Sequence, residues 1–172
     1  MNKKKLKYRV TYLEMNRKPS FDWPKNLKHK LSILLAESFP AWYFLFFYKQ
    51  VGKNYYWTDW LRKSEDEIDE FVNDKNVLLY TLIKDGWPVG FYMLDYRKKD
   101  ICDLSFFGLV DEVIGIGLGK YLLQTAILTA WDSRKIEKLT VNTCSLDHKS
   151  AIYLYQKYGF TPIKYKDLEK TV

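Results

Sequence analysis

Three of the eight glycines in the sequence, Gly115, Gly117 and Gly119, fall within five residues. An apolar run at 104–110 precedes them and a second run at 121–128 follows, which predicts a strand, a tight turn and a helix. The first N–H groups of a helix have no helical partner, and the helix dipole places about half a positive charge beside them. The turn is therefore predicted to bind a phosphate-bearing ligand.

Two familiar kinds of phosphate loop do not fit this turn. A P-loop requires a lysine followed by serine or threonine, whereas Lys120 is followed by Tyr121. A dinucleotide-binding turn follows the first strand of a parallel unit and has an acidic side chain about 20 residues later. Here the turn comes late in the chain, and the neutral Asn142 lies in that region. Neither ligand class is supported.

Composition restricts the class of protein further. The net charge is +7, yet most of the positive charge is lysine spread along the chain, so nucleic acid is not an expected partner. The longest apolar run, 41–48, is too short to cross a bilayer, and no signal peptide is recognisable, so no membrane association is expected. Cys102 and Cys144 are expected to be reduced thiols in a cytoplasmic protein. His29 and His148 lie far apart in sequence, and no metal site is expected.

Hydrophobic periodicity predicts the elements that must position the turn. Strands are expected at 6–15, 28–36, 77–84, 89–96, 101–110, 136–143 and 160–165. The stretch 28–36 is also compatible with a helix, and the alternation of Leu31, Ile33 and Leu35 favours the strand. Helices are expected at 40–51, 64–72, from the glycine turn to 131, and up to 159. This order predicts one α+β domain over residues 1–172, with a central mixed, mostly antiparallel sheet flanked by helices.

Local signals set several of the expected boundaries. Ser64 and Glu67 have capping-box spacing, which starts the helix at 64–72. The dipeptide Asp85-Gly86 predicts a hairpin turn, and Pro88 limits where the next strand begins. Ser145 or Asp147 is predicted to cap the last helix.

Two motifs together resemble the GCN5-related N-acetyltransferase (GNAT) superfamily. The first is the strand, turn and helix start at 109–119, which is similar to the family's acyl-CoA pattern of Gln or Arg, two residues, Gly, one residue, then Gly or Ala. Here Ile114 occupies the position of the Gln or Arg. The second is the stretch 146–160, which resembles the family's late helix through Ala151, Tyr155 and Gly159-Phe160.

The resemblance implies a sheet splayed at the cofactor site, an acyl-CoA-binding core at 76–165 and an acceptor-side part at 1–75. It implies acetyl-CoA as co-substrate, with backbone groups of Phe107 and Leu109 pairing with the pantetheine arm. The other residues implied to bind it are Ile114, Gly115, Ile116, Gly117, Leu118, Gly119, Lys120, Asn142, His148 and Ala151. Tyr155 is implied to protonate the departing thiolate, and Asp103 to accept the amine proton directly or through water.

The function implied is transfer of an acetyl group from acetyl-CoA to a primary amine by direct attack in a ternary complex. A non-catalytic acyl-CoA sensor on the same fold is the alternative. The acceptor, a small molecule or a peptide amine, is not readable, and a homodimer is left possible. Candidates for the acceptor side are Tyr12, Trp57, Trp60 and Tyr92, with the carboxylates Glu14 and Asp95.

Overall fold

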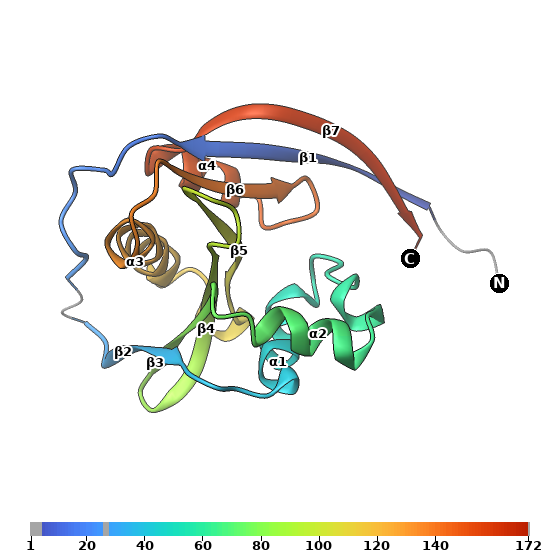
Figure 1. Cartoon of the computed structure of the whole chain (residues 1–172), viewed down its shortest axis with the longest axis horizontal. Coiled ribbons are helices and arrows are strands. Elements are labelled where there is room, and N and C mark those ends of the chain that lie inside the picture. Colours follow the sequence, from blue (N-terminus) through green and yellow to red (C-terminus); the bar gives the residue numbers. More distant parts are fainter. Residues whose placement is uncertain (1–4, 26–27, 172) are drawn as a thin grey trace.

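Seven strands form one sheet at the centre of the protein (Figure 1). The computed structural model describes residues 5–25 and 28–171. The strands are β1 (Lys5–Met15), β2 (Leu31–Ala36), β3 (Val77–Lys84), β4 (Trp87–Asp95), β5 (Ile101–Leu109), β6 (Lys138–Cys144) and β7 (Thr161–Thr171). Their order in the sheet is β2-β3-β4-β5-β6-β1-β7. Neighbouring strands are antiparallel, except that β5 and β6 run parallel. The α+β class predicted from the sequence is confirmed.

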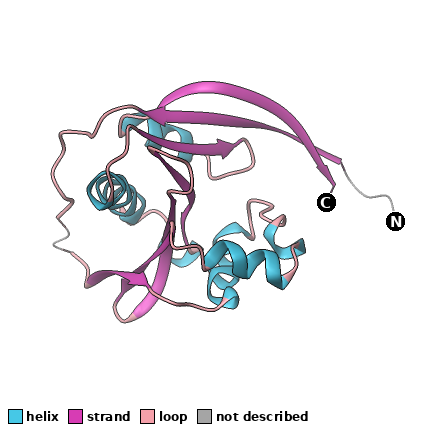
Figure 2. Ribbon diagram, viewed as in Figure 1, coloured by secondary structure: helices cyan, strands magenta, loops and turns pink. Residues whose placement is uncertain are grey.

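Helices cover both faces of the sheet (Figure 2). They are α1 (Ala41–Gly52), α2 (Glu65–Val72), α3 (Leu118–Ser133) and α4 (Ala151–Lys157). One apolar core lies between the sheet and α3, and a second lies between the sheet and the pair α1 and α2. Strand β4 serves both cores, because Tyr92 and Leu94 belong to the first and Phe91 and Met93 to the second. A strand covered on both faces is apolar along its length, as β4 is.

The sheet splays between β5 and β6. Their parallel pairing covers three residue pairs, from Ile101 with Lys138 to Asp103 with Thr140. Beyond Asp103, β5 continues to Leu109 along β4, and β6 continues to Cys144 along β1. The two strands therefore diverge toward their carboxyl ends, and this confirms the splayed sheet that the family resemblance implies.

The strands nearest the two ends of the chain pair with one another. The β1–β7 ladder runs from Lys5 with Thr171 to Glu14 with Thr161, and β1 also pairs with β6. The two strands arch beyond the rest of the sheet toward the side of α1 and α2 (Figure 1). There Lys170 Nζ donates to the carbonyl of Tyr56 at 2.7 Å. Strand β7 extends well past residue 165, where it was predicted to end, because β1 offers it a partner along its whole length.

Most predicted elements are present with small shifts of their ends. The strand at 77–84 is found with its predicted bounds, and β2 begins at Leu31. Strand β4 begins at Trp87, earlier than predicted, because the ladder shifts register between Leu82 and Ile83. This irregularity accommodates Pro88, which has no N–H to donate.

One predicted helix cap is confirmed and another is wrong. Ser64 Oγ accepts from the N–H of Glu67 at 3.3 Å, and Glu67 Oε2 accepts from the N–H of Ser64 at 3.1 Å. Hydrogen bonds from Lys63 and Ser64 lower the pKa of Glu67 to about 2. Neither Ser145 nor Asp147 caps α4, which begins after Ser150. Both side chains are engaged elsewhere, Ser145 Oγ with the N–H of Arg9 and the Asp147 carboxylate with the end of β6.

Among the described residues, no helix combines the length and the apolar character needed to cross a membrane.

Candidate active site

The divergence of β5 and β6 opens a cavity of about 460 Å³, which we call the first cavity. Its volume lies in the range of about 300–1,000 Å³ that is typical of small-molecule sites. Residues of β5, the glycine turn, the end of β6 and the start of α4 form its walls. The cavity therefore connects the glycine turn with the gap between the diverging strands.

The glycine turn presents bare backbone to this cavity at two positions. Gly115 and Gly117 have φ angles of +89° and +90°, a region that glycine adopts without steric cost. A Cβ atom built on either residue would meet no atom within 4 Å, so both face open space. Leu118 is only 3% exposed and fixes the start of α3 in the core, whereas Ile114 and Ile116 are 38% and 47% exposed. The turn thus has the form of a cradle for a phosphate group held by N–H groups.

Most of the residues predicted for the site lie around the first cavity. Those that line it are Phe107, Leu109, Ile114, Gly115, Gly117, Gly119, Asn142, His148, Ala151 and Tyr155. The other four predicted residues lie outside its lining: Asp103, Ile116, Leu118 and Lys120. Leu118 is buried in the core, and Lys120 is exposed in the first turn of α3.

Tyr155 is the buried phenol of the first cavity. It is 5% exposed, and its ring meets those of Phe107 and Phe160 edge-on, with centroids 6.1 and 5.8 Å away. Burial raises the pKa of Tyr155, and the negative charges of Asp147 and Asp103 raise it further. The hydroxyl therefore keeps its proton at neutral pH and is available as a donor. Of the other tyrosines on this part of the chain, Tyr153 is 73% exposed and does not line the cavity.

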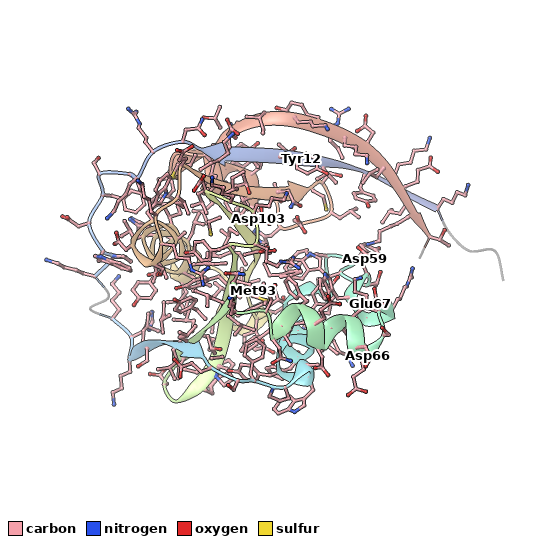
Figure 3. The ribbon with its side chains drawn as sticks, in the orientation of Figure 1. Tyr12, Asp59, Asp66, Glu67, Met93 and Asp103 are labelled. Carbon is pink, nitrogen blue, oxygen red and sulfur yellow. The ribbon has the colours of Figure 1, made fainter. Side chains whose placement is uncertain are left out.

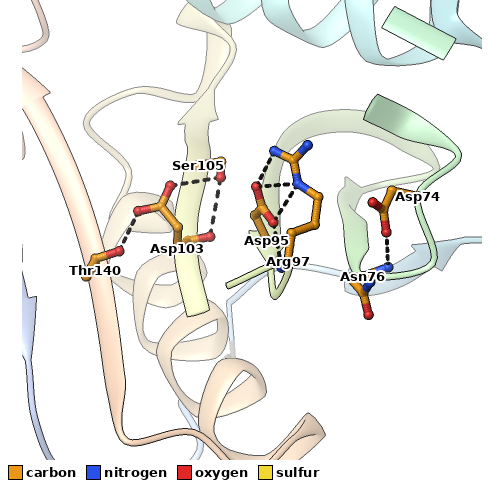
Figure 4. Close-up of polar contacts among 7 residues, drawn as sticks. All are labelled: Asp74, Asn76, Asp95, Arg97, Asp103, Ser105 and Thr140. Carbon is orange, nitrogen blue, oxygen red and sulfur yellow. Dashed lines mark hydrogen bonds and ion pairs between the residues drawn. The ribbon is translucent and has the colours of Figure 1, made fainter. Parts of the chain in front are cut away.

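Asp103 is linked to the first cavity through Ser105 (Figure 4). Its Oδ1 accepts from Thr140 Oγ1 at 2.6 Å, across the last parallel pair of β5 and β6. Its Oδ2 accepts from Ser105 Oγ at 2.9 Å. Ser105 lines the cavity whereas Asp103 does not, so the serine hydroxyl connects the carboxylate with the cavity.

Asp147, predicted from the sequence only as a helix cap, also faces the first cavity. Its Oδ1 accepts from Trp57 Nε1 at 3.1 Å, and its Oδ2 accepts from Thr143 Oγ1 and from the N–H of Cys144, both at 2.8 Å. The carboxylate therefore ties the segment after α1 to the end of β6. Its position just after a strand that ends at the splay was a signal of such a role, but the same position also suggested a helix cap.

A second cavity of about 260 Å³ adjoins the first. It lies between the segment after α1, strands β5 and β6, and the arching strands β1 and β7. The residues that line both cavities are Tyr55, Trp57, Ser105, Phe106, Asn142 and Asp147. The two cavities therefore meet beside Ser105 and Asp147.

Two of the aromatic residues predicted for the acceptor side, Trp57 and Trp60, line the second cavity. The others lie elsewhere. Tyr12 is outside both cavities, and Tyr92 is fully buried against Tyr80, with ring centroids 4.8 Å apart.

The two carboxylates predicted for the acceptor side form ion pairs away from both cavities. Glu14 pairs with Lys138 at 2.6 Å, and Asp95 pairs with Arg97 at 2.7 Å (Figure 4). Within residues 5–25 and 28–171, no group of three His, Cys, Asp or Glu side chains could hold a metal ion.

Comparison with solved structures shows proteins of the same fold. A GCN5-related N-acetyltransferase from Kribbella flavida has a TM-score of 0.63 and 14% identity, over 95% of this chain and 57% of that chain. A GNAT family acetyltransferase from Elizabethkingia anophelis, solved with acetyl-CoA bound, has a TM-score of 0.57 and 22% identity over 78% of each chain. An aminoglycoside acetyltransferase from an uncultured soil metagenomic sample, solved in complex with trehalose, has a TM-score of 0.55 and 14% identity over 74% and 84%.

The chain spans 51–66% of the length of four of the structures that it matches. No curated protein matches it. The sequence profile of the acetyltransferase (GNAT) family matches residues 36–160, which include the splayed strands, the glycine turn and α4. The chain therefore belongs to the GNAT acetyltransferase family.

Proposed function

We propose that this chain transfers an acetyl group from acetyl-CoA to a primary amine by direct attack in a ternary complex. The observation that carries the proposal is the meeting of two cavities where β5 and β6 diverge. One cavity reaches the glycine turn, and the other reaches the aromatic segment after α1, so there is room for two substrates at once. Holding two reactants side by side supplies a large part of an enzyme's rate.

The residues around the first cavity fit acetyl-CoA. Backbone N–H groups at Gly115, Gly117 and Gly119 would hold the pyrophosphate, and a side chain at Gly115 or Gly117 would fill the open space of the cradle. Beyond Asp103, the edge of β5 that faces β6 pairs with no described strand, so the backbone near Phe107 is available to the pantetheine arm. When bound, acetyl-CoA supplies the thioester carbonyl that an amine attacks and the thiol that leaves. Ile114 has no polar group, so phosphate recognition rests on the backbone.

Tyr155 and the pair Asp103 and Ser105 have complementary proton-transfer roles in this proposal. The amine nitrogen forms the new C–N bond as the C–S bond breaks. Ser105 Oγ takes the proton from the nitrogen and passes its own to Asp103 Oδ2, to which it is hydrogen-bonded at 2.9 Å. Tyr155 gives its hydroxyl proton to the departing sulfur. One proton is gained and one is lost by the protein, and solvent restores both groups.

A non-catalytic acyl-CoA sensor is the second candidate, and one observation favours it. Asp103, the predicted base, lines neither cavity. If the Ser105 relay does not operate, the site binds acetyl-CoA without activating an amine.

The decisive experiment measures two quantities on the whole chain. Isothermal titration gives the affinity for acetyl-CoA alone, and a thiol reagent follows release of free CoA with a panel of primary amines, with the amide product identified by mass. Thiol release that depends on the amine supports the enzyme. Binding of acetyl-CoA without release on any amine supports the sensor. Absence of binding overturns both candidates.

The raised pKa of Tyr155 predicts the shape of the pH profile. Its phenol keeps its proton from about pH 7 to about pH 10, because a free phenol titrates near pH 10 and burial raises the pKa of Tyr155 above that value. Over the same range an amine acceptor with a pKa of about 10 loses its proton. We therefore expect kcat/KM for the amine to rise throughout this range. A fall in kcat/KM that begins below about pH 9.5, and that is absent in Tyr155→Phe, would contradict a Tyr155 hydroxyl that stays protonated over this range.

A further inference from the structure

Seven of the fifteen residues that line the second cavity are aromatic. The rings that line it are Tyr8, Tyr48, Tyr55, Tyr56, Trp57, Trp60 and Phe106. Several of them pack on one another: Tyr48 lies 5.4 Å from Trp57, and Trp60 lies 5.9 Å from Phe106, measured between ring centroids. The volume of about 260 Å³ is below the range of about 300–1,000 Å³ that is usual for drug-sized ligands. The cavity thus suits a small occupant that has a flat ring and a polar group.

Of the three charged residues that line the second cavity, two pair with one another. Lys170 Nζ lies 3.6 Å from Asp59 Oδ2 and donates to the carbonyl of Tyr56, and its side chain is 14% exposed. Asp59 is exposed and lies on the side of α1 and α2 (Figure 3). These two charges offset one another at the outer part of the cavity. Asp147, where the two cavities meet, is the third charged residue of the lining.

We propose that the acceptor is a small primary monoamine with an aromatic or flat apolar body. This inference rests on the proposed function and names the class of amine that the same site takes. The ring of the amine packs against the aromatic walls, and the ammonium group lies toward the carboxylate of Asp147. In that orientation the nitrogen lies beside Ser105 at the entrance to the first cavity, where acyl transfer is proposed.

The same cavity disfavours an amino sugar such as glucosamine. Besides its one ammonium group, such a molecule carries several hydroxyl groups, each of which needs a polar partner when it is taken out of water. Apart from seven rings, the lining offers the neutral polar side chains of Ser105 and Asn142, and Lys170 already offsets the charge of Asp59. The charges of the cavity therefore match a single ammonium group, placed near Asp147.

The test compares three primary amines as acceptors: 2-phenylethylamine, n-propylamine and glucosamine. The phenyl ring buries enough apolar surface for kcat/KM, measured by thiol release, to exceed that of either other amine by at least about 10-fold. Tyr8→Leu removes one ring of the wall and is expected to reduce this preference by about 3- to 10-fold. The matched control is Tyr12→Leu, because Tyr12 lies on the same strand, β1, and outside both cavities.

The outcomes separate this inference from the proposed function. Thiol release in which glucosamine equals or exceeds 2-phenylethylamine overturns the inference and leaves the function intact. An equal loss of preference in the Tyr8 and Tyr12 variants also overturns it. If no amine supports thiol release, the proposed function fails. The inference is then decided by titrating the three amines into the protein saturated with CoA, where tighter binding of 2-phenylethylamine supports it and equal binding overturns it.

Discussion

Replacing Gly117 with valine is expected to weaken acetyl-CoA binding by more than about 100-fold, equivalent to about 2.7 kcal/mol. Gly117 has a φ of +90°, which a β-branched residue adopts only with strain, and it immediately precedes α3. The valine side chain would also project into the open space where the phosphate is proposed to lie. Both effects act on the N–H groups that form the cradle. Isothermal titration with acetyl-CoA measures the change directly.

Gly86→Val is a matched control for backbone strain. Gly86 has a φ of +92°, and a Cβ atom there also meets nothing within 4 Å, but it lies in the turn between β3 and β4. It lines neither cavity. The control variant should lose some stability in thermal unfolding and keep its affinity for acetyl-CoA. If the Gly117 variant binds acetyl-CoA with an affinity within about 3-fold of that of the unchanged protein, the glycine turn does not bind the phosphate.

Tyr155→Phe is expected to lower kcat by about 100-fold, or about 2.7 kcal/mol in the activation free energy. The phenylalanine ring keeps the edge contacts with Phe107 and Phe160, so the shape of the cavity is preserved. Only the hydroxyl proton is lost, and the departing thiolate then has to leave without an acid. The affinity for acetyl-CoA should stay within about 2-fold. Steady-state thiol release and titration of acetyl-CoA give the two numbers.

Tyr153→Phe removes a hydroxyl from the same helix, α4, and serves as the control. Tyr153 is 73% exposed and outside both cavities, so turnover should not change. If kcat falls equally in the two variants, the effect belongs to the helix and not to an acid at Tyr155. Unchanged turnover in Tyr155→Phe would exclude this hydroxyl from the reaction.

Features that depend on neighbouring residues were predictable from the sequence. The capping box of Ser64 and Glu67, the hairpin turn at Asp85-Gly86 and the glycine turn each follow from residues a few positions apart. The family resemblance added the splay between β5 and β6, which no local pattern reveals.

Features that depend on distant pairing were not predictable. Asp147 looks like a helix cap from its sequence neighbours, but a hydrogen bond from Trp57, 90 positions away, places it between the two cavities. Tyr8 and Lys170 help to line the second cavity only because β1 and β7 pair and arch over it. Periodicity identifies strands but does not specify which strands become neighbours in a sheet.

The position of β1 in the sheet has a consequence for biosynthesis. Arg9 and Ser145 are hydrogen-bonded although 136 positions separate them. A ribosome that adds about 5–20 residues per second therefore makes β1 roughly 7 to 27 s before this partner. During that delay β1 has two unpaired edges, which are templates for incorrect pairing.

The order of synthesis also determines when the lining residues of each cavity are available. The first cavity is lined by residues between Val51 and Tyr155, whereas the second also needs Lys170 on β7. On the ribosome, the residues that line the first cavity are therefore all made before those of β7 that help to line the second cavity. Chaperone protection of the nascent chain would matter most for β1 and for the second cavity, which β1 helps to line.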